Sequence, residues 1–90
     1  MDLTLGQVVY SKAGRDKGKK FIVVEIVDEL YVKICDGDLR KIEKAKLKKI
    51  KHLQVTGEVI LPLKEKLEKK ARVSNSDIRK ALEVTENNIK

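Results

Sequence analysis

The sequence has few of the residues that build metal sites, disulfide frameworks and nucleophilic active sites. Cys35 is the only cysteine and His52 the only histidine, so no internal disulfide can form and the ligands for a zinc site within one chain are lacking. Tryptophan is absent, and aromatic residues make up 3% of the chain. We therefore expect no metal, no cofactor and no small-molecule substrate.

Long hydrophobic runs are also missing. The longest are short stretches such as residues 21–24 and 59–61, far below the length that a transmembrane helix needs. The first four residues, Met-Asp-Leu-Thr, carry an acidic group where a signal peptide has a positive region. A single cysteine fits a reducing compartment. These features predict a cytoplasmic protein without a membrane partner.

Positive charge is abundant. Among 90 residues, 21 are Lys or Arg and 14 are Asp or Glu, which leaves a net charge of +7. Hydrophobic residues make up 41%, too large a share for a disordered tail. A chain of this length folds around a modest core and is too small for a deep cleft between two domains. Together these features predict a small basic module with a polyanionic partner.

The N-terminal half is predicted to be β-structure. Residues 6–10, 21–27 and 30–35 are β-prone runs, and Leu30, Val32 and Ile34 share one face of the third run. Residues 39–44 are a candidate fourth strand, and the three-residue spacing within 47–53 predicts a 3₁₀ turn. Five short strands with such a turn fit a small SH3-like barrel.

The hydrophobic period changes in the tail. Ile60, Leu63, Leu67 and Ala71 form one face of a helix. A capping pair of Ser74 and Asp77 predicts the start of a second helix. Its apolar stripe consists of Ile78, Ala81, Leu82 and Ile89. The predicted fold is mainly β, with a barrel over residues 1–56 and a short helical C-terminal extension over 57–90.

Two basic runs are the strongest functional signals. Residues 12–20 carry a net charge of +4 around Gly14 and Gly18, which allow sharp turns, and residues 40–51 carry +6. Lysine, arginine and turn amides in such a pattern bind phosphates, although solvated surfaces with no ligand are the alternative. The candidate RNA-binding residues are Lys12, Gly14, Arg15, Lys17, Gly18, Lys19, Lys20, Arg40, Lys41, Lys44, Lys46, Lys48, Lys49 and Lys51.

Aromatic stacking and catalysis have little support. Tyr10 and Phe21 are expected in the core, whereas Tyr31 could either fill the core or stack on a base. Cys35 lies among strand residues and is expected to be a buried thiol. His52 lies in a basic strip, where it would contact RNA or pack. With no nucleophile and base in reach of each other, we expect no enzyme activity.

Several segments resemble the KOW motif of RNA-binding proteins. They are Gly6–Val9, Gly14–Lys19 and Phe21–Ile26, and two later segments, 36–41 and 48–53, resemble the large-subunit ribosomal protein fourteen family of archaea and eukaryotes. The resemblance covers about residues 6–54 and implies an SH3-like barrel that binds ribosomal RNA. It maps the central glycine of the motif onto Gly18 and its basic residues onto Arg15, Lys17 and Lys19. Phe21 stands where many KOW proteins have a second glycine.

The leading hypothesis is an RNA-binding protein that contacts ribosomal RNA or the large subunit, with ribosomal proteins as further partners. The alternative is a protein–protein adaptor of the transcription or translation machinery, since the resemblance extends to KOW domains that dock on proteins. The apolar stripes of the tail could serve such docking, or they could pack on the barrel.

Overall fold

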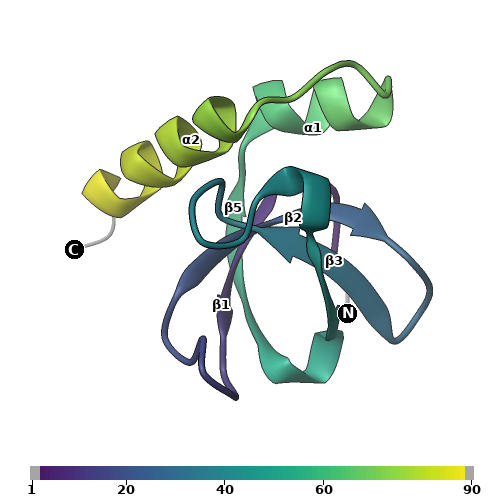
Figure 1. Ribbon diagram of the computed structural model, residues 1–90, viewed down its shortest axis with the longest axis vertical. Helices are drawn as coiled ribbons and strands as arrows, with labels where there is room; N and C mark the ends of the chain where they lie inside the picture. Colours follow the sequence, from purple (N-terminus) through teal and green to yellow (C-terminus); the bar gives the residue numbers. More distant parts are fainter. Residues whose placement is uncertain (1–2, 89–90) are drawn as a thin grey trace.

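Five antiparallel strands form one sheet in the order β4-β3-β2-β1-β5 in the computed structural model, which describes residues 3–88 (Figure 1). The strands are β1 (Gln7–Ser11), β2 (Lys20–Ile26), β3 (Tyr31–Cys35), β4 (Lys46–Lys49) and β5 (Leu53–Val59). Short 3₁₀ helices precede and follow β4, namely η1 (Ile42–Lys44) and η2 (Ile50–His52). Two α-helices complete the chain, α1 (Leu61–Glu68) and α2 (Asn75–Asn88). The predicted mainly β class is confirmed.

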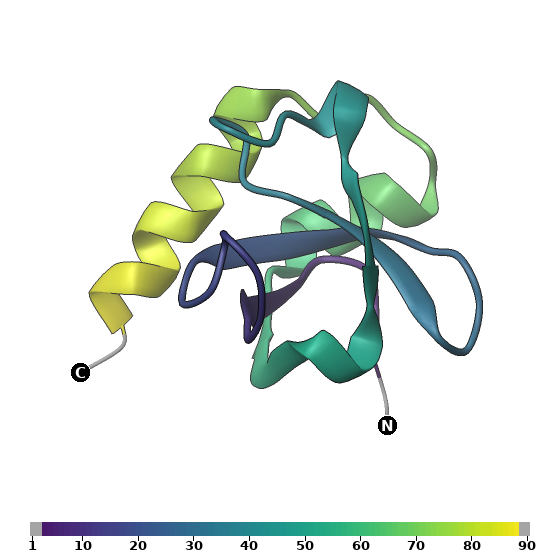
Figure 2. The same ribbon diagram turned by 60° about the horizontal axis from the view of Figure 1, so that its bottom comes forward.

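The sheet is strongly curved. Its two edge strands, β4 and β5, are consecutive in the chain and are joined only by η2, so the edges must approach each other at that end (Figure 2). Register shifts between Gln7 and Val9 and between Val23 and Glu25 interrupt the ladders of the central strands. Such irregularities increase the twist and bend of a strand, which helps the sheet to curl.

Each face of the sheet carries its own hydrophobic cluster. The concave face holds the first cluster, which is Val9, Phe21, Val23, Val32, Ile34 and Leu53. The opposite face holds Val8, Ile22 and Cys35 beneath residues of the tail. Neighbouring residues of β1 and β2 therefore point into different clusters, because side chains alternate across a strand. This explains why residues 21–24 form a continuous apolar run.

The helices cover the convex face (Figure 1). Leu63 of α1 and Ile78 of α2 are buried against the sheet, and full burial of such a side chain contributes about 1.5–3 kcal/mol. The predicted cap of α2 is confirmed: the Ser74 hydroxyl accepts from the Asp77 amide and the Asp77 carboxylate accepts from the Ser74 amide, each at 3.1 Å. Helix α1 ends at Glu68, so Ala71 lies outside it.

The 3₁₀ turn expected within 47–53 is confirmed as η2, Ile50–His52. Two other expectations about the β-region are wrong in detail. The candidate strand at 39–44 is a loop followed by η1, and the fourth strand is Lys46–Lys49. Leu30 does not face inward with Val32 and Ile34 but is 66% exposed. It belongs to a tight turn in which the Asp28 carboxylate accepts from the amides of Leu30 and Tyr31, both at 2.8 Å.

The division of the chain at residue 56 stays a prediction. In the structure β5 continues to Val59, so the helical region begins at Leu61. The tail also shares a hydrophobic cluster with β1 and β2. Of the predicted stripe on α2, Ile78, Ala81 and Leu82 pack on this cluster, whereas Ile89 lies outside the described residues.

Candidate nucleic-acid interface

The basic loop, defined as residues 12–19 between β1 and β2, is ordered by its own backbone. The Gly18 amide donates to Ser11 O at 2.8 Å, and the Lys19 amide donates to Asp16 O at 2.9 Å. Gly18 has φ +86°, in the left-handed region that glycine adopts without strain. This folding leaves Arg15, Lys17 and Lys19 exposed to solvent. The loop is a shaped cationic surface and not a loose connection.

The second basic run reaches this loop through two lysines of β4. Lys46 Nζ lies 3.1 Å from the Asp16 carboxylate, and Lys48 Nζ donates to Ala13 O at 3.3 Å. The hydrogen bond from Lys46 lowers the pKa of Asp16, and the positive charges of Arg40 and Lys19 nearby lower it further. The structure therefore brings the two sequence-distant runs together at this point.

The lysines of β4 that reach the loop are more buried than the cations of the loop itself. Lys46 and Lys48 pair across the ladder with Ile34 and Val32, so they lie on the concave face. Lys48 is only 9% exposed, because its aliphatic chain extends the hydrophobic cluster while its amine reaches the loop. Both amines are occupied by the loop, whereas Arg15, Lys17 and Lys19 keep their head groups in solvent.

The remaining cations of the second run diverge. Lys49 and Lys51 are exposed and lie, with Lys12, around a hollow at the η2 end of the sheet. Lys44 lines a different hollow against α1, on the helix-covered side. Lys41 is exposed in the loop before η1, and Arg40 is half-buried near Asp16. The candidate residues thus do not all share one surface.

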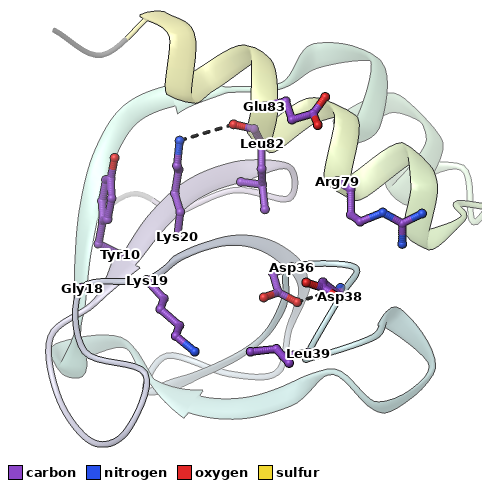
Figure 3. A pocket seen from close by; sticks show the side chains of 10 residues that line it. All are labelled: Tyr10, Gly18, Lys19, Lys20, Asp36, Asp38, Leu39, Arg79, Leu82 and Glu83. Atoms are coloured by element: carbon purple, nitrogen blue, oxygen red, sulfur yellow. Dashed lines mark hydrogen bonds between the residues drawn. The ribbon is translucent and has the colours of Figure 1, made fainter.

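Lys20 and Lys19 line a hollow of about 630 Å³ between the basic loop, residues 36–39 and α2. The Lys20 amine donates to Leu82 O at 3.3 Å, which ties β2 to α2 (Figure 3). The charged residues of this hollow balance: Lys19, Lys20 and Arg79 face Asp36, Asp38 and Glu83. A neutral balance makes it a weaker phosphate site than the outer surface of the loop.

The aromatic residues are placed as follows. Phe21 is 1% exposed in the concave cluster, and Tyr10 is half-buried. Tyr31 is also half-buried, and the amine of Lys49 lies 6.0 Å from the centre of its ring. This distance is at the limit of a cation–π contact. The ring of Tyr31 is thus partly engaged by a neighbouring cation.

Other chemistry finds little support. Cys35 is fully buried, and burial raises the pKa of its thiol to about 12, which keeps it protonated and unreactive. Among residues 3–84, whose side chains the structure describes, no three His, Cys, Asp or Glu side chains are grouped so that they could hold a metal ion. No helix within residues 3–88 is long and apolar enough to cross a membrane.

Sequence reasoning missed two features of this region. The first is that Asp16 anchors the basic loop by pairing with Lys46. The available signal was that Asp16 is the one acidic residue among five cations of this run. The hollow beside η2 has Leu30 as one wall, and Leu30 was expected inside. The polar pair Asp28-Glu29 before it was the available signal, since an Asp side chain often accepts from the amide two residues on, which places Leu30 in the turn and not in the strand.

Comparison with known proteins identifies the family. The chain is 33% identical over 81 residues to the large ribosomal subunit protein eL14 of Pyrobaculum calidifontis, a match that covers 90% of this chain and 72% of the relative. The eL14 proteins of Pyrobaculum arsenaticum and Pyrobaculum neutrophilum match over the same shares, at 32% and 33% identity. No protein-family model matches the chain.

These matches are longer than the resemblance read from the motifs. That resemblance ended near residue 54, but a match of 81 residues must extend well into the helical tail. The tail is therefore part of what this chain and its relatives have in common. The family suggested by the basic loop and the later segments is confirmed, and the chain belongs to the eL14 family of large ribosomal subunit proteins.

Proposed function

We propose that this chain binds ribosomal RNA of the large subunit through a loop–strand platform, defined as the basic loop together with Lys46 and Lys48 of β4. In this role it is a cytoplasmic component of a ribonucleoprotein, with RNA and neighbouring ribosomal proteins as partners and no reaction of its own. The relatives named large ribosomal subunit protein eL14 support the setting. The geometry of the platform supports the choice of this surface as the one that binds RNA.

The observation that carries the proposal is the pair of contacts from β4 to the loop. Lys46–Asp16 at 3.1 Å and Lys48–Ala13 at 3.3 Å hold the loop against the sheet. The Lys46 contact also neutralises the one carboxylate within the loop. The outward cations are thus presented from a fixed base, and less conformational entropy is lost when phosphates bind them.

The alternative of a protein–protein adaptor has less support, because the apolar stripes of the tail that could dock on a partner are packed on the sheet. Leu63 and Ile78, which belong to the two apolar stripes of the tail, are 4% and 0% exposed against the sheet. A docking partner could reach them only if the helices detached. The outward cations of the loop need no such rearrangement.

The test is RNA binding by fluorescence anisotropy over a range of salt concentrations, with a fragment of large-subunit RNA. If about six phosphates are neutralised, log K should fall with log salt with a slope of about −4 to −5. Replacing Lys17 and Lys19 together by Glu should weaken binding roughly a hundredfold, for all RNA sequences alike.

The matched control reverses two exposed lysines elsewhere, Lys69→Glu with Lys80→Glu, which changes the net charge by the same amount. The proposal expects this control to bind nearly as well as wild type, because long-range charge effects are screened within about 10 Å at 0.1 M salt. A salt-independent affinity, or equal losses in the two double variants, would reject the platform.

A further inference from the structure

A hollow of about 460 Å³ lies at the η2 end of the sheet, beside the basic loop. Its apolar lining comes from Leu30 of the β2–β3 turn, Ile50 of η2 and Leu53 of β5. Leu53 is 2% exposed and belongs to the concave cluster, whereas Leu30 is 66% exposed. The hollow therefore combines a buried apolar floor with one apolar wall that is open to solvent.

The rim of the hollow is cationic. Lys12, Lys49 and Lys51 surround it and are all exposed, with Glu29 as the one acidic neighbour. Lys12 comes from the basic loop, and the other two come from the end of β4 and from η2. Cations thus stand on more than one side of an apolar floor.

The walls are fixed by the backbone. The Ile50 amide donates to Leu30 O at 2.8 Å, and the Lys12 amide donates to His52 O, also at 2.8 Å. The first bond holds the β2–β3 turn against η2, and the second holds the start of the basic loop against it. The Asp28 carboxylate keeps Leu30 in its outward position. The backbone that surrounds the hollow is therefore held in place by hydrogen bonds before any ligand binds.

We propose that this hollow receives one unpaired nucleotide, with its base on the apolar floor and its flanking phosphates on Lys12, Lys49 and Lys51. This inference rests on the proposed function and extends it from backbone contacts to a site for a single base. The faces of a base are largely apolar, and bases in loops and bulges can turn out of the stack. A duplex presents only phosphates, sugars and groove edges, which would leave the apolar floor unused.

Continuity favours RNA over an acidic peptide as the occupant. Lys12 belongs both to the rim and to the basic loop, so a strand bound to the platform passes the hollow without a break in positive charge. The volume also fits, since sites for small ligands span about 300–1,000 Å³. It accommodates a nucleotide but not a helix of either nucleic acid or protein.

The test compares Leu30→Ser with Leu61→Ser. Both leucines are 66% exposed, and Leu61 lies at the start of α1, so the two substitutions remove equal apolar surface at different places. The probes are a short unpaired oligoribonucleotide, the same strand with abasic riboses at its centre, and a duplex of the same length.

Leu30→Ser should bind the unpaired strand about fivefold more weakly, with an unchanged salt slope, and should bind the abasic strand and the duplex like wild type. Leu61→Ser should match wild type on all three probes. Leu30→Tyr should bind the unpaired strand more tightly than wild type, because an aromatic wall stacks on a base.

Three outcomes would overturn the inference. The first is an equal loss on the abasic strand, and the second is no loss on any RNA while an acidic leucine-containing peptide binds wild type and not Leu30→Ser. Both leave the platform intact as an RNA surface. The third is a wild-type protein that binds none of the RNA probes, which would remove the proposed function together with the hollow.

Discussion

Two basic segments meet in this fold and present their cations in opposite ways. In the loop between β1 and β2, Arg15, Lys17 and Lys19 extend into solvent. On β4, Lys46 and Lys48 turn towards the loop and contact Asp16 and Ala13. Residues of the same charge are thus free for the proposed RNA contact in the loop and hold the loop to the sheet in the inward positions of β4, and their direction relative to the sheet distinguishes the two cases.

The largest expected effect is on stability and separates two adjacent residues of β4. Lys48→Glu should destabilise the protein by about 3 kcal/mol, because it removes a hydrogen bond to Ala13 O and places a carboxylate at a buried position facing a carbonyl. Lys49→Glu, exposed and on the other face of the strand, should cost about 0.5 kcal/mol.

Urea unfolding of both variants measures this difference. Far-ultraviolet circular dichroism at low urea checks that each variant still forms the sheet. Similar losses at the two positions would mean that Lys48 is no more structural than its exposed neighbour, and the distinction between lysines that hold the loop and cations free to contact RNA would fail.

The complementary effect is on RNA affinity. Lys17→Ala should bind RNA about fivefold more weakly and lower the magnitude of the salt slope by about 0.7–0.9, the share of one phosphate contact. Its urea midpoint should equal that of wild type, because its side chain is exposed in the loop. A changed urea midpoint together with an unchanged salt slope of RNA binding would show that Lys17 stabilises the fold and does not contact RNA, which is the opposite of the role expected for the loop cations.

A smaller effect tests the ion pair that joins the two segments. Asp16→Asn should lower the free energy of unfolding by about 0.5–1 kcal/mol at neutral pH, since it removes the charge that Lys46 contacts at 3.1 Å. The fold lowers the pKa of Asp16 below its ordinary value of 3.8, so the carboxylate stabilises the fold above that pH. This contribution is lost as the pH falls through the lowered pKa.

Unfolding curves from neutral to acidic pH should therefore show a gap between wild type and Asp16→Asn that closes at low pH. In the Asp16→Asn background, adding Lys46→Met should cost less than Lys46→Met does alone, since the partner is already gone. A gap that stays constant down to the lowest pH would show that Asp16 acts without its charge.

Local patterns in the sequence were sufficient for much of this architecture. The strand at 21–27, the glycine-hinged loop and the Ser74–Asp77 cap were each predicted from neighbouring residues and are present, the strand as Lys20–Ile26. Strand β4 was misplaced because its period is inverted: Leu47 is 52% exposed, whereas Lys48 is buried. A rule that points apolar residues inward cannot find a strand whose inward positions are lysines.

The candidate site has the same limit. Two basic runs could be read from the sequence, but the contact between Lys46 and Asp16 joins residues 30 positions apart and depends on the curvature of the sheet. Leu30 was misassigned because the alternation of β3 was extended one residue into the turn that precedes it. Which lysines contact the loop depends on the tertiary structure, and the composition of the two runs does not distinguish them.

The smallest expected effect concerns Lys44, a cation of the second run that is not part of the loop–strand platform. It lines a hollow with Val24, Lys33 and Leu67 on the helix-covered side and not with the basic loop. Lys44→Ala should therefore change RNA affinity by less than about twofold and leave the salt slope unchanged. Fluorescence anisotropy titrations of RNA with Lys44→Ala and with Lys17→Ala compare two variants that have each lost one positive charge. If Lys44→Ala instead lowered the salt slope as much as Lys17→Ala, the bound RNA would have to extend around β4 to η1. The direction of a side chain relative to the sheet would then no longer distinguish the cations that contact RNA from those that hold the loop in place.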